Sequence, residues 1–439
     1  MRTILRSFFF IGFCIALESR GQRLLTPEEA IAATLSNNYD ILLAKNDSTI
    51  AAIDYSYRNV ALFPRLNGNL GTTWTNNNAK QILSDGTKRE SRGLESNNIT
   101  AQLALNWTLF DGLKMFATRD KLAEFVRLGE LVIKNQVINS VADVINTYYN
   151  IVRQKQQLRA IEEQMSINDE RVKLAQYKLD IGAGTKPDVL QAKVDLNAQH
   201  AARLQQESLI SQLKEDLNQL MGAQLNSNYE VLDTIPINKD LMLVDIQQLA
   251  ENNNPSLLIA KKNIDIAGIA LRERRAERFP VISFNSSYNF NRNKNQTVIN
   301  TFSTLYNRNY GYNYGLTATI PIFNNFNVRR LIDQAELDIK YYQLSYDNQR
   351  SLISLAVLKA YKNYEQQKRA LELEEANILL AKENVSIIFQ IYRLGATTYL
   401  QLREAQQSLE DAYNRLITAR YNTKLSETEL LRLKGELVR

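Results

Sequence analysis

The sequence of 439 residues is poor in the residue types that carry most enzyme and metal chemistry. It has one histidine, His200, and one cysteine, Cys14. Cys14 lies in an N-terminal segment that we expect to be removed, so the mature chain would have no disulfide bond and no reactive thiol. Without a further His or Cys, no ordinary zinc site can be built, and the sequence has no Gly-rich phosphate loop. We therefore expect no cofactor, no bound metal and no enzymatic activity.

Residues that interrupt helices are also scarce. The chain has 16 Gly and 7 Pro, whereas average usage would give about 30 and 22 for this length. Each Pro lies near an expected element boundary, which leaves long stretches free to be helical. After the N-terminal segment, no run of about 18 consecutive apolar residues predicts a membrane-spanning helix. Charges of both signs alternate along the chain and the net charge is +6, which favours solvated helix faces over nucleic-acid binding.

Residues 1–21 are predicted to be a secretory signal peptide. Arg2 and Arg6 supply the positive charge, and Phe8 to Leu17 form an apolar segment. The small residues Ser19 and Gly21 then predict cleavage before Gln22. We expect the mature chain to act outside the cytoplasm.

The remaining chain contains two copies of one pattern, 213 positions apart. We expect a single unit of two repeats, 22–224 and 244–439, joined by an irregular connector, 225–243. Each repeat is predicted to begin with a helix, over residues 22–62 and 245–278. The pairs that carry the repeat are Phe110 and Phe323, Gly182 and Gly395, Thr185 and Thr398, Ala192 and Ala405, and Leu196 and Leu409.

Alternating apolar and polar residues predict two strands in each repeat, over about 64–76, 98–110, 280–291 and 310–323. In 99–109, for example, every second residue from Ile99 to Leu109 is apolar, and the residues between are mostly Asn, Thr and Gln. Polar stretches join the two strands of each pair. Strands of about ten residues with one apolar face are typical of transmembrane β-barrels. The same pattern also fits a soluble hairpin with one face on a core, and the strands alone leave both possibilities open.

Very long helices are predicted after each strand pair, over 113–181 and 327–394. The second stretch contains no Gly or Pro, and at 1.5 Å per residue each helix would be about 100 Å long. Apolar residues recur every seven positions in both, which predicts a coiled-coil seam. Returning helices are predicted over 186–222 and 399–436. The seam positions are Val137, Val144, Ile151, Leu158, Met165, Val172 and Leu179 in the first copy, and Val357, Tyr364, Leu371, Ile378, Val385 and Tyr392 in the second, where Arg350 replaces the first apolar residue.

A short turn with a glycine follows each long helix. Gly182 and Gly395 are predicted to take the left-handed conformation that ends a helix, and Thr185 and Thr398 to cap the returning helix. Small residues at the end of a helical hairpin also allow a second helical protein to approach closely. We therefore predict a docking site at both turns, although helix capping alone would also explain these residues. The predicted docking residues are Gly182, Ala183, Gly184, Thr185, Gly395, Ala396, Thr397 and Thr398.

Polar side chains just beyond the turns form a second candidate site. These are Asp188 and Gln191 in the first copy and Gln401 and Glu404 in the second. If the helices line a tube, such side chains would surround its entrance, where rings of carboxylates select cations. We predict that these four residues form an entrance or gate.

The duplicated pattern resembles the TolC-type outer-membrane efflux protein family. The resemblance covers the mature chain and is most specific in Gly182–Ala192 (GAGTKPDVLQA) and Gly395–Ala405 (GATTYLQLREA). Supporting segments are Phe63-Pro64 and Phe279-Pro280 before the strands, and residues 108–112 (TLFDG) and 320–324 (IPIFN) after them. In the family member best known for its gate, two aspartates follow the second turn. Gln401 and Glu404 stand there in this chain, so a doubled carboxylate ring is not expected.

The resemblance implies a fold and a set of partners. The fold would be α+β but mostly α, with duplicated coiled-coil hairpins forming an α-barrel in the periplasm. Four strands per chain would give a trimer with a 12-stranded transmembrane β-barrel in outer-membrane lipid. The trimer would be the passive exit duct of a tripartite efflux or type I secretion system, with a periplasmic adaptor protein and an inner-membrane pump of the RND or ABC type. The alternative is an elongated periplasmic coiled-coil scaffold with a soluble β cap.

Overall fold

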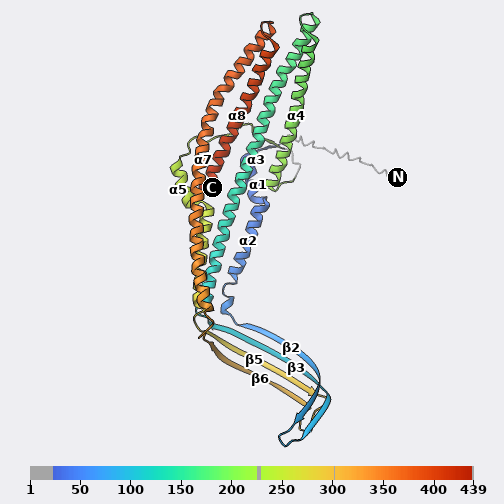
Figure 1. Ribbon diagram of the computed structural model, residues 1–439, viewed down its shortest axis with the longest axis vertical. Coiled ribbons are helices and arrows are strands. Elements are labelled where there is room, and N and C mark those ends of the chain that lie inside the picture. The colour runs from blue at the N-terminus through green and yellow to red at the C-terminus, as the bar shows by residue number, and fades with distance from the viewer. Residues whose placement is uncertain (1–22, 225–228, 301, 438–439) are drawn as a thin grey trace, which may run out of the picture. The chain divides into compact units, whose positions relative to one another are not determined.

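The computed structural model describes residues 23–224, 229–300 and 302–437 (Figure 1). The predicted signal peptide, residues 1–21, lies outside these residues, as does Cys14. The chain divides into two compact units, and each takes segments from both sequence repeats. Unit 1 contains the described residues up to Ile41, Val137–Gln248 and the residues from Ala356 on. Unit 2 contains Leu42–Gln136 and Leu249–Leu355.

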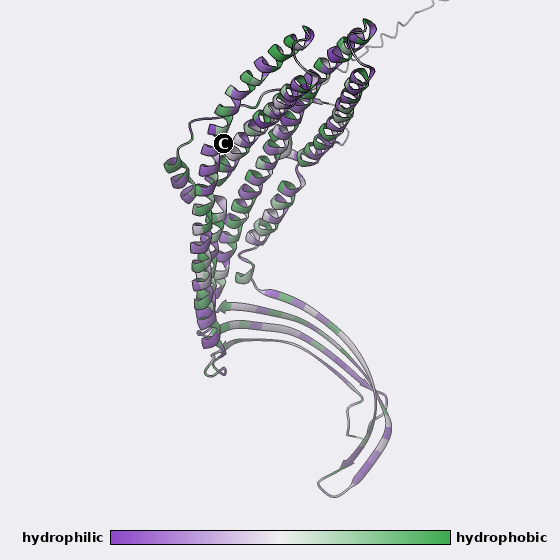
Figure 2. Ribbon diagram, turned by 45° about the horizontal axis from the view of Figure 1, so that its top comes forward, coloured by the Kyte–Doolittle hydropathy of each residue, from purple (hydrophilic) through white to green (hydrophobic). Residues whose placement is uncertain are grey.

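Four long helices account for almost half of the chain. Helices α3, Lys114–Asp180, and α7, Asn327–Arg393, have 67 residues each, which corresponds to about 100 Å. Helices α4, Lys186–Met221, and α8, Tyr399–Lys434, have 36 residues each. Hydrophobic and hydrophilic residues alternate along all four (Figure 2). None of the helices in the described ranges combines the length and the low polarity needed to cross a membrane.

The two copies bury their sevenfold apolar positions to different extents. In the second copy all six positions are buried: Val357, Tyr364, Leu371, Ile378, Val385 and Tyr392. In the first copy Val144 and Ile151 are buried, and the four positions after them are half-buried. In the second hairpin, residues of α7 and α8 share one apolar cluster that includes Leu371, Val385 and Leu409. The two hairpins therefore have similar sequences but different cores.

The helix predicted over residues 22–62 is wrong, because this segment is broken. Strand β1, Arg23–Leu25, precedes α1, Pro27–Asn37, and α2, Tyr39–Ser56, and the short 3-10 helix η1, Val60–Leu62, follows. Asn38 interrupts the helix because its backbone is extended (φ −61°, ψ 127°). Its side chain accepts a hydrogen bond from the Ile41 N–H at 3.1 Å and donates one to the Leu220 carbonyl at 2.8 Å.

The helix predicted over residues 245–278 is broken in the same way. It consists of α5, Leu243–Asn253, and α6, Pro255–Ala276. The Asn254 side chain accepts hydrogen bonds from the N–H groups of Ser256 and Leu257, at 3.0 and 3.4 Å, and so caps α6. Pro255 occupies the first helical position, where its missing N–H costs nothing.

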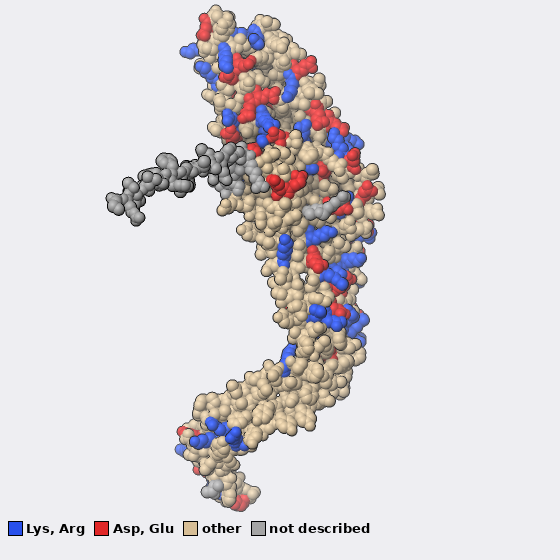
Figure 3. Space-filling model, turned by 180° about the vertical axis from the view of Figure 1, so that it is seen from behind, with Lys and Arg blue, Asp and Glu red and all other residues tan. Residues whose placement is uncertain are grey.

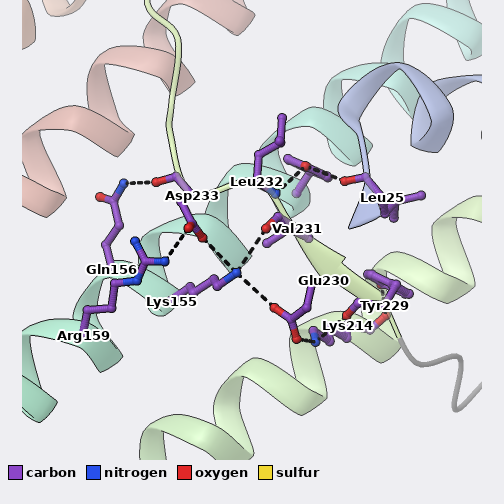
Figure 4. A network of polar contacts seen from close by, with 11 residues as sticks. Leu25, Lys155, Gln156, Arg159, Lys214, Tyr229, Glu230, Val231, Leu232 and Asp233 are labelled. Atoms are coloured by element: carbon purple, nitrogen blue, oxygen red, sulfur yellow. Dashed lines mark hydrogen bonds and ion pairs between the residues drawn. The ribbon is translucent and has the colours of Figure 1, made fainter. Parts of the chain in front are cut away.

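A small parallel pair, β1 and β4, Tyr229–Val231, forms part of the core of unit 1. β4 lies within the connector that was predicted to be irregular. The buried Tyr148 hydroxyl on α3 donates to the Leu25 carbonyl at 2.8 Å and accepts from the Leu232 N–H at 3.0 Å. Lys155 contacts the Val231 carbonyl, Glu230 and Asp233 at 3.2, 3.0 and 2.8 Å (Figure 4). These contacts fix both short strands to α3.

Unit 2 contains a four-stranded antiparallel sheet with the order β2-β3-β5-β6. The strands are β2, Arg65–Ile82, β3, Lys88–Phe110, β5, Val281–Asn295, and β6, Tyr306–Thr319. The first two are longer than predicted because the ladder continues through the polar residues 75–97, from Thr75 opposite Ser96 to Ile82 opposite Lys88. β6 ends at Thr319, before the predicted residue 323. β2 and β6 are the two edges of this sheet.

The two faces of the sheet differ as the alternation predicts. Cross-strand pairs such as Phe290 with Tyr310, and Tyr288 with Tyr312, place apolar residues together on one face. On the opposite face Ser287 pairs with Asn313, and the Ser287 hydroxyl donates to the Asn313 side chain at 2.7 Å. β2 from residue 66 to 79, β3 from 96 to 110, β5 up to residue 291 and β6 from residue 309 contain no charged residue. The greater part of the sheet is therefore uncharged on both faces.

Candidate functional site

The candidate site consists of the two helical turns of unit 1 and the side chains that connect their hairpins. α3 ends at a turn in which the Gly182 N–H donates to the Leu179 carbonyl at 3.0 Å and the Ala183 N–H donates to the Lys178 carbonyl at 2.8 Å. Gly182 has φ +75°, which is the left-handed conformation that this type of helix end requires. Gly182 and Ala183 are exposed, and no atom lies within 4 Å of the position that a Cβ at Gly182 would occupy.

The second turn has the same geometry. The N–H groups of Gly395 and Ala396 donate to the carbonyls of Tyr392 and Ile391, both at 3.1 Å, and Gly395 has φ +77°. The third turn residue differs between the copies, because Gly184 of the first turn corresponds to Thr397 of the second. A Cβ at Gly184 would lie 2.9 Å from the Lys178 Cβ. Gly184 is therefore required by packing within its own turn.

Two of the four predicted entrance residues cap helices. Asp188 accepts hydrogen bonds from the Thr185 N–H at 3.2 Å and from the Thr185 hydroxyl at 2.6 Å. Gln401 accepts from the Thr398 N–H at 3.2 Å, and its own N–H donates to the Thr398 hydroxyl at 3.3 Å. In both hairpins the third helical residue thus completes a capping box with the preceding threonine.

The other two predicted entrance residues lie one turn further along α4 and α8. The Gln191 side chain donates to Asp195 at 2.9 Å. Glu404 is exposed on α8. Gln191 therefore belongs to a larger polar network through Asp195, whereas Glu404 presents its carboxylate to the surface of this chain.

A buried arginine connects the two hairpins close to their turns. Arg171 on α3 has a side chain that is 2% exposed, and its Nη2 lies 2.6 Å from an Asp195 oxygen on α4. Its Nη1 donates to Gln406 on α8 at 3.0 Å, and the Tyr399 hydroxyl of α8 donates to Asp195 at 2.5 Å. Gln406 in turn donates to Asn168 on α3 at 3.4 Å. We refer to Arg171, Asp195, Tyr399, Gln406 and Asn168 as the inter-hairpin network.

A second contact joins the ends of the two long helices. The Lys178 ammonium donates to the Tyr392 carbonyl at 3.1 Å and lies 4.3 Å from the centre of the Tyr392 ring. Burial, and then the negative charge of Asp188, raise the pKa of Tyr392. The two turns therefore lie side by side, as Figure 1 also shows.

The charges of the inter-hairpin network are mutually stabilised. Burial acts to raise the pKa of Asp195, but the hydrogen bonds from Tyr399 and Gln191 and the positive charge of Arg171 outweigh it and hold this pKa below its ordinary value. Burial and the hydrogen bond to Asp195 raise the pKa of Tyr399, so its hydroxyl remains a donor. At neutral pH the network contains one carboxylate and one guanidinium.

No residue of the inter-hairpin network was among the residues predicted from the sequence to be functional. A signal was present, because Gln164, Arg171 and Lys178 recur every seven residues, each one position before the apolar residues Met165, Val172 and Leu179. Polar residues beside an apolar seam are candidates for contacts with a neighbouring helix. Of the described side chains, no three or more His, Cys, Asp or Glu lie close enough to hold a metal ion.

Comparison with known proteins shows which family this chain resembles. The family model described as outer membrane efflux protein matches residues 30–223 and 246–436. The chain is 23% identical over 419 residues to the alkaline protease secretion protein AprF of Pseudomonas aeruginosa, which covers 91% of this chain and 84% of that protein. It is 24% identical over 299 residues to the outer membrane protein TolC of Vibrio cholerae, with 67% of each chain covered.

A solved structure supports the same fold. The outer membrane protein VceC of Vibrio cholerae superposes with a TM-score of 0.74 over 93% of this chain and 96% of that chain, at 15% sequence identity. The likeness extends over both units and both hairpins. At this level of identity it establishes the shared fold of the chains.

Proposed function

This chain belongs to the outer membrane efflux protein family and is a channel protein of the outer membrane, and from this premise we propose that three copies form one exit duct. The duct would pass substrates from an inner-membrane pump and a periplasmic adaptor to the exterior. The channel itself would be passive, with the energy supplied by the pump. The alternative, a periplasmic scaffold with a soluble β cap, is not favoured by these comparisons.

The observation that carries the trimer proposal is the sheet of unit 2. It has four strands, open edges at β2 and β6, and a largely uncharged surface on both faces. Unpaired strand edges are not tolerated in lipid, and four strands are too few to close a barrel. We propose that β2 of one copy pairs with β6 of the next, so that three copies close a 12-stranded transmembrane β-barrel.

The helices would form the periplasmic part of the duct. The six buried sevenfold positions of the second copy support continuous packing along the long helices, and three copies would arrange their hairpins as an α-barrel. We propose that the two turns dock the adaptor, through Gly182, Ala183, Gly184 and Thr185 of the first turn and Gly395, Ala396, Thr397 and Thr398 of the second. The exposure of Ala183 and Ala396 supports this role.

Fewer side chains are available to face the entrance than the sequence alone suggests. Asp188 and Gln401 are engaged in capping boxes, so their side chains have a structural role in each hairpin. We propose that Glu404, which is exposed, supplies the carboxylate that faces the entrance, one from each of three chains. Gln191 would act indirectly, by holding Asp195 in the inter-hairpin network.

Disulfide trapping tests the trimer. The only natural cysteine, Cys14, lies in the predicted signal peptide, so Thr73→Cys on β2 can be combined in turn with Asn309→Cys, Asn313→Cys and Thr317→Cys on the same face of β6. We expect one pair to give disulfide-linked trimers in outer-membrane detergent extracts. Thr73→Cys with Ser287→Cys, on the central strand β5, is the matched control and should give no linked species. A monomer in the periplasmic fraction, without linkage at any pair, would refute the duct.

A further inference from the structure

Three cations lie together on one face of the sheet, at the end where the hairpin loops are. Arg292 on β5 is the direct cross-strand partner of Arg308 on β6, and Lys294 follows two residues later, opposite Tyr306. Direct partners have their side chains on the same face, about 5 Å apart at Cβ, and residues two apart on a strand share a face. Arg292, Lys294 and Arg308 therefore form a compact group, which we call the basic cluster.

The fold does not neutralise this cluster. Like charges directly opposite each other destabilise a strand pair. The β3 residues opposite Arg292 and Lys294 are Ile99 and Asn97, which are uncharged. The nearest carboxylate in strand register is Glu95, diagonal to Lys294, and it accepts a hydrogen bond from Asn76 on its other side. Arg292, Lys294 and Arg308 form no ion pair with any carboxylate of the described chain.

Both arginines have hydrogen-bond donors without a partner among the described residues. The guanidinium of Arg308 lies 5.5 Å from the centre of the Phe290 ring and 5.5 Å from that of Tyr310, and these two rings are themselves cross-strand partners. A guanidinium that rests on aromatic faces keeps its in-plane N–H groups available for a bidentate acceptor such as phosphate. The Arg292 Nε is buried and has no hydrogen-bond partner among the described residues.

The surface beside the basic cluster indicates which kind of molecule would bind these cations. On the same face, toward the other end of the strands, lie Tyr310, Tyr312, Tyr314 and Leu316, which are 67%, 77%, 73% and 69% exposed. Figure 3 shows charged side chains at the loop end of the sheet and an uncharged surface over the rest of it. Tyrosines are typical of the membrane–water interface, and cations beside an apolar membrane surface attract anionic headgroups.

We propose that Arg292, Arg308 and Lys294 bind the phosphate group of a lipid in the outer leaflet, whose acyl chains lie along the apolar face beside them. The proposal rests on the proposed function, because that function turns this face toward lipid. It adds a bound partner of defined chemistry. The phosphate would neutralise the two opposed arginines and accept hydrogen bonds from their guanidinium N–H groups.

Native mass spectrometry of the detergent-extracted trimer tests the proposal. The probes are diphosphorylated lipid A, the same lipid with its phosphates removed, and inorganic phosphate. We expect the unmodified protein to retain the phosphorylated lipid preferentially. Arg292→Gln with Arg308→Gln should lower that retention about tenfold or more, since two charge-assisted contacts are lost. Lys88→Gln with Arg89→Gln removes the same charge from the start of β3, outside the cluster, and should leave retention unchanged.

Three results would overturn the lipid site. These are equal retention of the phosphorylated and dephosphorylated lipids, an equal loss in the Lys88→Gln/Arg89→Gln control, and full displacement of lipid by millimolar inorganic phosphate. The first two would show general adhesion, and the third a site for a free anion. Failure of the duct proposal would be recognised separately, as a monomer mass in every sample. An intact trimer without selective retention would refute the lipid site alone.

Discussion

Removing the negative charge of Asp195 should loosen the contact between the two hairpins near their turns. In Asp195→Asn the side chain keeps its shape, but Arg171, which is 2% exposed, loses the charge that compensates its own. Breaking a buried ion pair by removing one partner costs about 3–5 kcal/mol. Because Asp195 itself is 20% exposed, we take the lower end, about 3 kcal/mol. Each 1.4 kcal/mol is a factor of ten, so local opening should increase about 100-fold.

Changing both Arg171 and Asp195 tests whether charge or shape holds the two hairpins together. Arg171→Met removes the guanidinium but retains an apolar side chain of similar length, and it leaves no buried charge uncompensated. Adding Arg171→Met to Asp195→Asn should therefore recover much of the loss, because a buried ion pair replaced as a whole by apolar or neutral groups is often close to neutral. A contact that acted only by shape would show the opposite, with the double variant less stable than either single variant.

Hydrogen exchange measured by mass spectrometry on the first turns of α8, from Tyr399 to Gln406, reports this opening directly. Lys173→Ala is the matched control on α3, since Lys173 pairs with Asp169 at the surface and both are well exposed, and exchange in α8 should not change. If Asp195→Asn left exchange in α8 within a factor of about three, corresponding to less than 1 kcal/mol, the network would not hold the hairpins together. Equal exchange in the single and double variants would refute the electrostatic explanation.

Four further outcomes follow from the same contacts. Because the pKa of Asp195 is lowered in the folded protein, the Asp195 carboxylate stabilises the hairpin contact fully above its ordinary pKa of about 3.9, and this stabilisation is lost as the pH falls through the lower folded pKa. Hydrogen exchange in α8, corrected for intrinsic rates, should therefore be the same at pH 7 and pH 5 and rise only below about pH 4. Gly222→Ala should lower the thermal midpoint of the protein, because Gly222 has φ +62° and a Cβ there would lie 2.3 Å from the Asn37 carbonyl oxygen. An unchanged midpoint would contradict this packing. Ala396→Trp should reduce transport without changing the oligomeric mass of the protein, and unchanged transport would remove the turn from the proposed adaptor site. Glu404→Ala should raise conductance or weaken cation block in planar bilayers, and identical traces would remove Glu404 from the entrance.

The sequence predicts the long helices and their turns closely because these features are local. Gly182 and Gly395, each followed by threonine three residues later, are local signals for a helix end and a new helix start. The observed ends of α3 and α7 lie within one residue of the predicted ones. The break at Asn38 was missed for the opposite reason, since it depends on a hydrogen bond to Leu220, far away in the sequence.

The extent of the strands could not be predicted from side-chain alternation alone. Residues 75–97 lack the regular apolar alternation that marks the rest of β2 and β3, yet backbone pairing continues on both sides of the turn at 83–87, with one irregularity between Asn77 and Ala79. Polar side chains there contact each other across the strands, as in the 3.0 Å hydrogen bond from the Ser96 hydroxyl to Thr75. Backbone hydrogen bonds between strands form with polar side chains as well as with apolar ones. The strands predicted from apolar alternation therefore ended where the apolar surface ends, although the pairing continues.

The inter-hairpin network was missed because its members are far apart in the sequence. A comparison of the two copies indicates how the contact within a chain would differ from the contact between chains. At the positions 213 residues away, Arg171 corresponds to Asn384, Asp195 to Ser408, Tyr399 to Lys186 and Gln406 to Lys193. In a closed ring of three chains, the contact within a chain would contain the arginine and the carboxylate, whereas the related contact between chains would contain Asn384, Ser408 and two lysines. The second set contains no carboxylate and therefore cannot form an ion pair within itself. The contact within each chain would therefore be the stronger one near the turns, and any widening of the entrance would begin between chains, with each pair of hairpins moving as one body.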